Sequence, residues 1–161
     1  MTTTFRDFLR QEAEKYQAEV RAGKATVDEW RAAVERLFAQ MRAWLREADP
    51  EGTIEIKESQ ADVREPGLGR YRVPRLDLQV FGEWIGIIPK ARKTVITATP
   101  PQGRAPERAA GRVDITDELR RYVLYRFAED DREIWLIDDL ESEPKLLTQE
   151  AFEKALMSYL R

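Results

Sequence analysis

Residues 26–45 read TVDEWRAAVERLFAQMRAWL, and this stretch decides the fold of the chain. Its apolar side chains recur at steps of four, three, four and three residues, which is the spacing of one face of an α-helix. They are Trp30, Val34, Leu37, Met41 and Trp44, with Val27, Phe38 and Leu45 beside them. Thr26 followed by Glu29 is typical of a capping box, so we expect a helix that begins at Thr26 and ends near Pro50.

A shorter helical pattern precedes this stretch. Thr4 and Asp7 resemble an N-terminal cap, and Gly23 is the kind of residue that ends a helix. The apolar residues between them at helical spacing are Phe5, Phe8, Leu9, Tyr16 and Val20. Because only a few residues separate the two patterns, the sequence predicts an N-terminal helical hairpin over residues 1–49.

From residue 53 onward the period of the apolar pattern changes to two. Ile54 and Ile56, for example, are each followed by a charged residue, which is typical of a strand with one buried face. Gly82 followed by Glu83 predicts a two-residue hairpin turn, and the Pro- and Gly-rich stretch 99–111 predicts a loop. Short strands joined by tight turns favour an antiparallel meander of about six or seven strands over residues 53–139.

The chain closes with a predicted helix over residues 147–161. Thr148 is a suitable N-cap, and Phe152 belongs to an apolar face. A helix of this length is marginal in isolation, so we expect it to pack on the sheet. Together these patterns predict a single α+β domain over residues 1–161, with a helical hairpin, an antiparallel sheet and a C-terminal helix.

The composition excludes several kinds of chemistry. Among 161 residues there is no Cys and no His, so thiol and imidazole catalysis and the usual zinc sites are impossible within the chain. We therefore predict no catalytic residues, no metal and no cofactor, and a non-enzymatic protein. No apolar run approaches the roughly 18 residues that span a bilayer, which argues against a membrane partner. The excess of Arg and Ala suits a prokaryotic protein, and we expect a cytoplasmic one.

Charge is distributed unevenly along the chain. The net charge of −3 divides into −2 for residues 1–60, +5 for residues 61–112 and −6 for residues 113–161. The basic segment raises the hypothesis of a nucleic-acid-binding protein, in which Lys and Arg side chains contact phosphates. The candidate phosphate contacts are Arg64, Arg70, Arg72, Arg75, Lys90, Arg92, Lys93, Arg104 and Arg108. The alternative is that these side chains pair with the acidic segments when the sheet forms.

Glu55-Ile56-Lys57 raises a second alternative. A Glu and a Lys at this spacing on a strand resemble part of the metal site of restriction-endonuclease-like hydrolases. The upstream acids, Glu47 and Asp49, fall at the end of a predicted helix, so the strand that presents the second acid in such enzymes is missing. A metal-dependent, nuclease-like hydrolase therefore ranks last.

The leading hypothesis is a small accessory protein that acts through protein–protein contacts, with a protein partner or a second copy of the chain. The apolar stripe of residues 26–45 is wider than one short helix can cover, and aromatic side chains often anchor interfaces. The candidate contact residues are Trp30, Leu37, Phe38, Met41 and Trp44.

Overall fold

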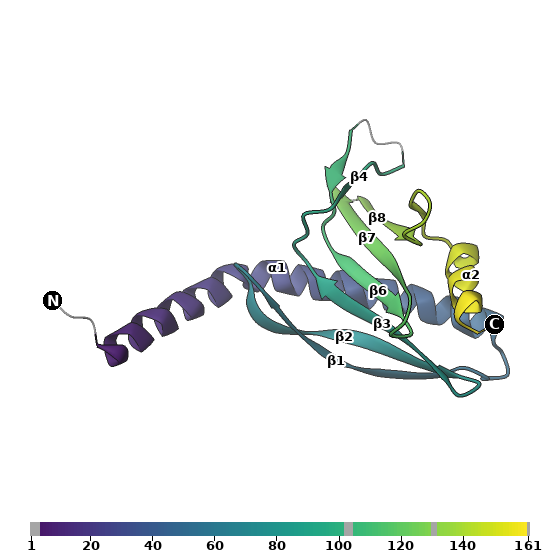
Figure 1. Ribbon diagram of the computed structural model, residues 1–161, viewed down its shortest axis with the longest axis horizontal. Coiled ribbons are helices and arrows are strands. Elements are labelled where there is room, and N and C mark those ends of the chain that lie inside the picture. Colours follow the sequence, from purple (N-terminus) through teal and green to yellow (C-terminus); the bar gives the residue numbers. More distant parts are fainter. Residues whose placement is uncertain (1–3, 102–104, 130–131, 161) are drawn as a thin grey trace.

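A computed structural model describes residues 4–101, 105–129 and 132–160 (Figure 1). Two helices lie on one face of a seven-stranded antiparallel sheet, which confirms the α+β class. The helices are α1 (Phe5–Ala48) and α2 (Gln149–Tyr159). The strands of the main sheet are β1 (Glu55–Glu65), β2 (Gly69–Val80), β3 (Glu83–Ala91), β6 (Arg112–Thr116), β7 (Arg121–Glu129), β8 (Arg132–Asp138) and β9 (Lys145–Leu146).

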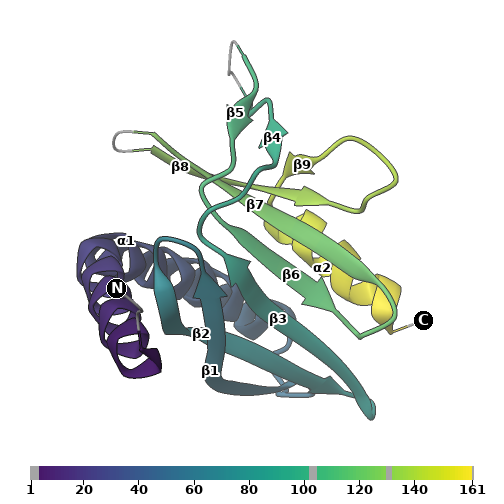
Figure 2. The same cartoon turned by 60° about the vertical axis from the view of Figure 1, so that its left-hand side comes forward.

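The sheet is a meander with one insertion. Its strand order is β1-β2-β3-β6-β7-β8-β9, so every strand pairs with its neighbours along the chain except where the inserted segment separates β3 from β6. The insertion contains β4 (Thr97–Ala98) and β5 (Glu107–Arg108), which pair with each other. The predicted loop 99–111 is thus partly a hairpin arm, which Figure 2 shows standing above β7 and β8; residues 102–104 lie outside the described ranges.

The predicted helical hairpin is wrong, because α1 is one continuous helix of 44 residues. Gly23 lies in its interior and is buried. A Cβ atom on Gly23 would lie 2.9 Å from Leu68 Cδ2 and 3.1 Å from the Gly67 carbonyl oxygen. The glycine therefore serves close packing of the β1–β2 turn on the helix and does not end the helix. The cap at the true N-terminus is as predicted: the Thr4 hydroxyl accepts a hydrogen bond from the Asp7 amide at 3.1 Å.

The main core lies between the helices and the inner face of the sheet. Trp30, Val34 and Met41 of α1 are fully buried against strand residues such as Leu76 and Ile115. A smaller second core lies on the outer face, where the β4–β5 arm covers β7 and β8. It contains Ala109, Val123, Tyr125, Phe127 and Leu136, with Ile96, Ala98 and Ile134 at its margin.

The C-terminal helix packs on the sheet as expected. The Thr148 hydroxyl caps α2 by accepting a hydrogen bond from the Ala151 amide at 3.1 Å. Phe152 is fully buried, with its ring 5.6 Å from that of Trp44. The Tyr159 hydroxyl donates a 2.7 Å hydrogen bond to the Ile115 carbonyl. The apolar face of α2 therefore continues the core that α1 begins.

The turn between β2 and β3 differs from the predicted one by one residue. Val80 pairs with Glu83, so the two central residues are Phe81 and Gly82 and not Gly82 and Glu83. Both have positive φ, 52° and 78°, which is the requirement of a type I′ turn. Phe81 adopts this strained conformation. Its side chain is 78% exposed, so little packing offsets the strain.

We therefore expect Phe81→Asn to stabilise the protein. Asn tolerates positive φ better than a bulky residue does, and an exposed ring loses little packing. The free energy of unfolding should rise by about 1 kcal/mol, measured by urea denaturation. Phe81→Val, which is β-branched, should lower it; a Val variant as stable as the Asn variant would contradict the turn assignment.

Among the glycines of the described residues, Gly111 has the shortest distance from a built Cβ to a neighbouring atom. Its φ is 154°, and a Cβ there would lie 2.3 Å from Cζ3 of the Trp30 indole. Gly111→Ala should therefore lower the free energy of unfolding by about 3 kcal/mol or more, through strain and overpacking together. Gly52 also has positive φ, 72°, but a Cβ on this residue would have no neighbouring atom within 4 Å. Gly52→Ala should lower the free energy of unfolding by only about 1 kcal/mol. Equal effects of the two variants would show that the indole contact contributes nothing.

Candidate functional site

The five apolar side chains expected to contact a partner are placed inside the folded chain. Trp30, Leu37, Phe38 and Met41 are at most 4% exposed, and Trp44 is half-buried against α2. The sheet and α2 together cover a stripe that a single short helix could not. The prediction that this stripe is an open contact surface is therefore corrected: it is the core-facing side of α1.

The exposed apolar surface of α1 lies instead in its N-terminal part. This part of the helix extends beyond the sheet, to the left in Figure 1. Phe5 is 74% exposed, Phe8 and Leu9 are each 49% exposed, and Tyr16 is 47% exposed. The rings of Phe5 and Phe8 stack at 6.4 Å. At 100° per residue these side chains continue the same face that holds Trp30, so the core-facing stripe runs on past the end of the core.

The sequence does contain a sign that α1 is one continuous helix. Only one glycine interrupts the helical pattern, since Lys24 and Ala25 are good helix formers. A continuous helix of 44 residues is about 66 Å long, more than a small sheet can cover. Tyr16 and Val20 of α1 approach Gly69 at the start of β2, and α1 residues 5–18 are exposed. Residues 5–15 lie beyond that contact.

The basic residues predicted to contact phosphates are distributed over several places. Arg64 and Arg70 face each other across β1 and β2, and Lys93 lies beside Gly67 in the turn that joins these strands. Lys90 is exposed at the end of β3, and Arg108 is exposed on the β4–β5 arm. Arg104 lies outside the described residues.

The other three predicted phosphate contacts have acidic partners. Arg75 binds Asp77 at 2.7 Å, Arg72 lies 3.5 Å from Asp62, and Arg92 lies 3.6 Å from Glu29. The main chain of Lys93 is also engaged, since its amide donates to the buried Glu65 carboxylate at 2.8 Å. The structure therefore brings part of the basic segment together near the β1–β2 turn and neutralises another part within the sheet.

Glu55 and Lys57 lie exposed at the start of β1, an edge strand. Within residues 4–101, 105–129 and 132–160, no group of three acidic side chains is arranged to hold a metal ion. The predicted helix end at Glu47 and Asp49 is real, but Asp49 accepts hydrogen bonds from the amides of Thr53 and Ile54 and so closes the turn into β1. The geometry adds no support to the nuclease-like hypothesis.

A buried polar network joins α1 to β7 and β8. Arg126 is 2% exposed and binds Glu133 at 2.8 Å and Glu29, with its guanidinium 6.0 Å from the Trp30 ring. Glu133 also accepts a 3.0 Å hydrogen bond from Arg36. Burial opposes ionisation of Glu133, but the hydrogen bonds from Arg36 and Arg126 outweigh it and hold the pKa of this carboxyl below its ordinary value. Each charge has its partner, so the network fixes the helix on the sheet.

A buried carboxylate, that of Glu65, secures the start of the arm. Glu65 accepts hydrogen bonds from the Arg92 and Lys93 amides at 2.9 and 2.8 Å, and from the Tyr71 hydroxyl. Burial first, and then the adjacent carboxylate, raise the pKa of Tyr71. The phenol therefore stays protonated and acts as a donor, which is a structural role.

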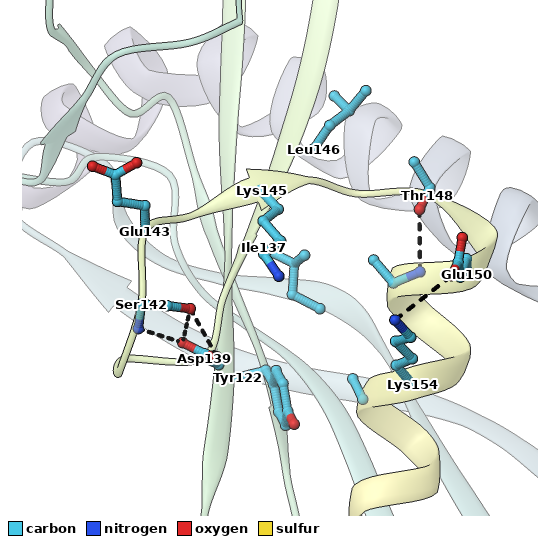
Figure 3. Close-up of a pocket in the computed structure, with 12 residues that line it drawn as sticks. Tyr122, Ile137, Asp139, Ser142, Glu143, Lys145, Leu146, Thr148, Glu150 and Lys154 are labelled. Atoms are coloured by element: carbon cyan, nitrogen blue, oxygen red, sulfur yellow. Dashed lines mark hydrogen bonds and ion pairs between the residues drawn. The ribbon is translucent and has the colours of Figure 1, made fainter.

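A cavity of about 390 Å³ lies between α2 and the β8–β9 end of the sheet (Figure 3). Tyr122, Ile137 and the alanines of α2 form its apolar wall. Asp139 accepts hydrogen bonds from the Ser142 amide and hydroxyl, and Glu150 pairs with Lys154 at 3.6 Å. These contacts engage Asp139, Glu150 and Lys154. Glu143 and Lys145 also line the cavity, and neither belongs to a salt bridge of the described residues.

No protein-family model, curated protein or solved structure matches this chain. Among the described residues, neither helix has the length and apolar character needed to cross a membrane.

The network around Glu133 makes a prediction about pH. Because the pKa of Glu133 is lowered in the folded state, its contribution to stability is present above the ordinary value of 4.5 and is lost as the pH falls below it. Glu133→Gln should lower the free energy of unfolding by about 2 kcal/mol at pH 7. The difference in free energy of unfolding between wild type and variant should narrow as the pH falls from 5 to 3. Chemical denaturation at each pH measures this difference.

The matched control is Glu143→Gln, which changes an exposed carboxylate of the β8–β9 loop. It should change stability by less than about 0.5 kcal/mol at neutral pH. If the difference in free energy of unfolding between wild type and Glu133→Gln stays constant between pH 5 and pH 3, the network does not hold the Glu133 carboxylate ionised.

Proposed function

We propose that this chain is a non-enzymatic binding protein that acts through protein–protein contacts made by the N-terminal part of α1. The observation that supports this proposal is the exposure of Phe5, Phe8 and Leu9 on one side of a helix that extends beyond its own core. An apolar helix face that the chain leaves uncovered is typical of an interaction surface.

The charges around this face favour a protein over a lipid surface. Residues 5–15 carry three basic and three acidic side chains, so the segment has no net attraction for anionic lipids. Glu12 lies in the middle of the apolar stripe, where it pairs with Lys15 at 3.4 Å. A carboxylate at this position opposes insertion into a bilayer but is tolerated in a helix–helix contact.

The occupant we propose is the same segment of a second copy, packed antiparallel. In this arrangement Phe5 lies opposite Tyr16 of the second copy, Phe8 lies opposite Ala13, and Leu9 lies opposite Glu12, whose carboxylate is paired with Lys15. The contact is repeated by the two-fold axis, as in most homodimers, and the balanced charges make it self-complementary. Eleven residues give about 16 Å of helix, so the dimer is weak and depends on concentration.

Sedimentation equilibrium between roughly 1 μM and 1 mM tests this proposal. The wild type should change from monomer to dimer over that range, and Phe8→Glu with Leu9→Glu should stay monomeric. These residues lie beyond the body of the protein, so the melting temperature should not change. Phe81→Ser removes an apolar ring of similar exposure from the β2–β3 turn and should dimerise like the wild type.

The absence of Cys from the chain permits a test of the helix orientation. A mixture of Phe5→Cys and Tyr16→Cys proteins should form a disulfide-linked dimer under mild oxidation, while each variant alone should not. Cross-linking of each variant with itself would show a parallel pair. A wild type that remains monomeric at the highest concentration would refute self-association.

A further inference from the structure

A row of residues crosses the outer face of the sheet, away from α1 and α2. The strand registers place Lys57 beside Asp77, Asp77 beside Gly86, Gly86 beside Thr116, and Thr116 beside Arg121. Residues opposite each other on antiparallel strands point to the same face. The two ends of the row, Lys57 and Arg121, are exposed, and neither forms a salt bridge within the described ranges.

The indole of Trp84 covers the middle of this row. Trp84 lies two residues before Gly86 on β3 and so points to the same face. A Cβ on Gly86 would lie 2.5 Å from Cζ2 and 2.9 Å from Cη2 of the indole, so only glycine lets the ring lie against the strand. The ring is also fixed at its edge, because its Nε1 donates a 2.7 Å hydrogen bond to Asp77.

The side chain that positions the indole is held in turn. Asp77 accepts two hydrogen bonds from the Arg75 guanidinium, at 2.7 and 3.2 Å. Trp84 belongs to neither hydrophobic core of the described residues, and its side chain is half-buried. The indole is therefore held on the outer face of the sheet by Gly86 and Asp77, and it remains partly exposed to solvent.

We propose that this surface binds single-stranded nucleic acid, with one base stacked on Trp84 and the neighbouring phosphates contacted by Lys57 and Arg121. Aromatic side chains on which bases stack, flanked by cations, are the common means of binding single strands. Each cation lies two strands from Gly86, about 10 Å away, which a Lys or Arg side chain can span toward a phosphate beside the base. The proposal is independent of the α1 interface.

Local charge supports this site although the whole chain has a net charge of −3. Arg75 neutralises Asp77, so the row keeps the two charges of Lys57 and Arg121. Acidic residues also flank the row: Glu55 lies two residues before Lys57 on β1, and Asp117 and Glu118 lie in the turn before Arg121. The favourable charge is therefore that of the Lys57 and Arg121 side chains themselves. A duplex keeps its bases stacked inside and cannot use the indole, so the site should prefer single strands.

Fluorescence anisotropy with a fluorescein-labelled single-stranded DNA of mixed sequence is the direct test. At low salt the wild type should bind it and should bind the matching duplex more weakly. Trp84→Ala should weaken single-strand binding by about tenfold or more, and Trp84→Phe should restore part of the affinity. Lys57→Ala with Arg121→Ala should reduce the slope of log K against log salt by about 1.4, as expected for two lost phosphate contacts.

Two control variants separate this site from general effects. Phe81→Ala removes an aromatic ring from the adjacent turn, and Lys24→Ala with Arg46→Ala removes two exposed cations of α1. Both should bind like the wild type. The Lys57 and Arg121 side chains are exposed, so their variant reports on binding even if Trp84→Ala fails to fold.

Three results would overturn the proposal. The first is no anisotropy change with single strands at low salt. The second is Trp84→Ala binding as tightly as the wild type in a folded protein. The third is an affinity for a poly-glutamate peptide equal to that for single-stranded DNA, which would assign the surface to an acidic protein segment.

Discussion

The packing of Trp30 against Gly111 is the contact on which the arrangement of this chain depends. The indole is fully buried and lies where any side chain at residue 111 would be. Arg126 lies over the same ring and forms ion pairs with Glu29 and Glu133, so the apolar contact and the buried charges secure one point of α1 on the sheet. Since a buried charge without a partner is strongly destabilising, apolar packing and ion pairing must form together.

This attachment determines which parts of α1 are covered. The sheet and α2 enclose the helix from the β1–β2 turn to its C-terminal end, where Leu45 is still buried. The N-terminal segment carries the same apolar face but has no strand beneath it. The exposed Phe5, Phe8 and Leu9 are thus a consequence of a helix that is longer than the surface it packs on, and this mismatch makes the segment available for a contact between molecules.

Much of the fold could be predicted because it rests on local periodicity. The period of α1, the alternation in the strands and the caps at Thr4 and Thr148 are all properties of residues close together in the chain. The errors arose where a local signal had a tertiary cause. Gly23 looks like a helix end, but it permits the approach of Leu68. The wide stripe around Phe38 suggests a free surface, but strand residues such as Leu76 and the C-terminal helix, with Phe152, cover it.

The sequence by itself determined the α+β class, the antiparallel meander and the exclusion of thiol and imidazole chemistry, because these follow from composition and short-range spacing. Only the tertiary structure decided which surfaces are open. Strand register aligns Lys57 with Arg121, residues 64 positions apart, in one row with Asp77, Gly86 and Thr116. No periodicity encodes such alignment, since it depends on how each turn sets the pairing of its strands, and a shift by one residue would move every side chain to the other face.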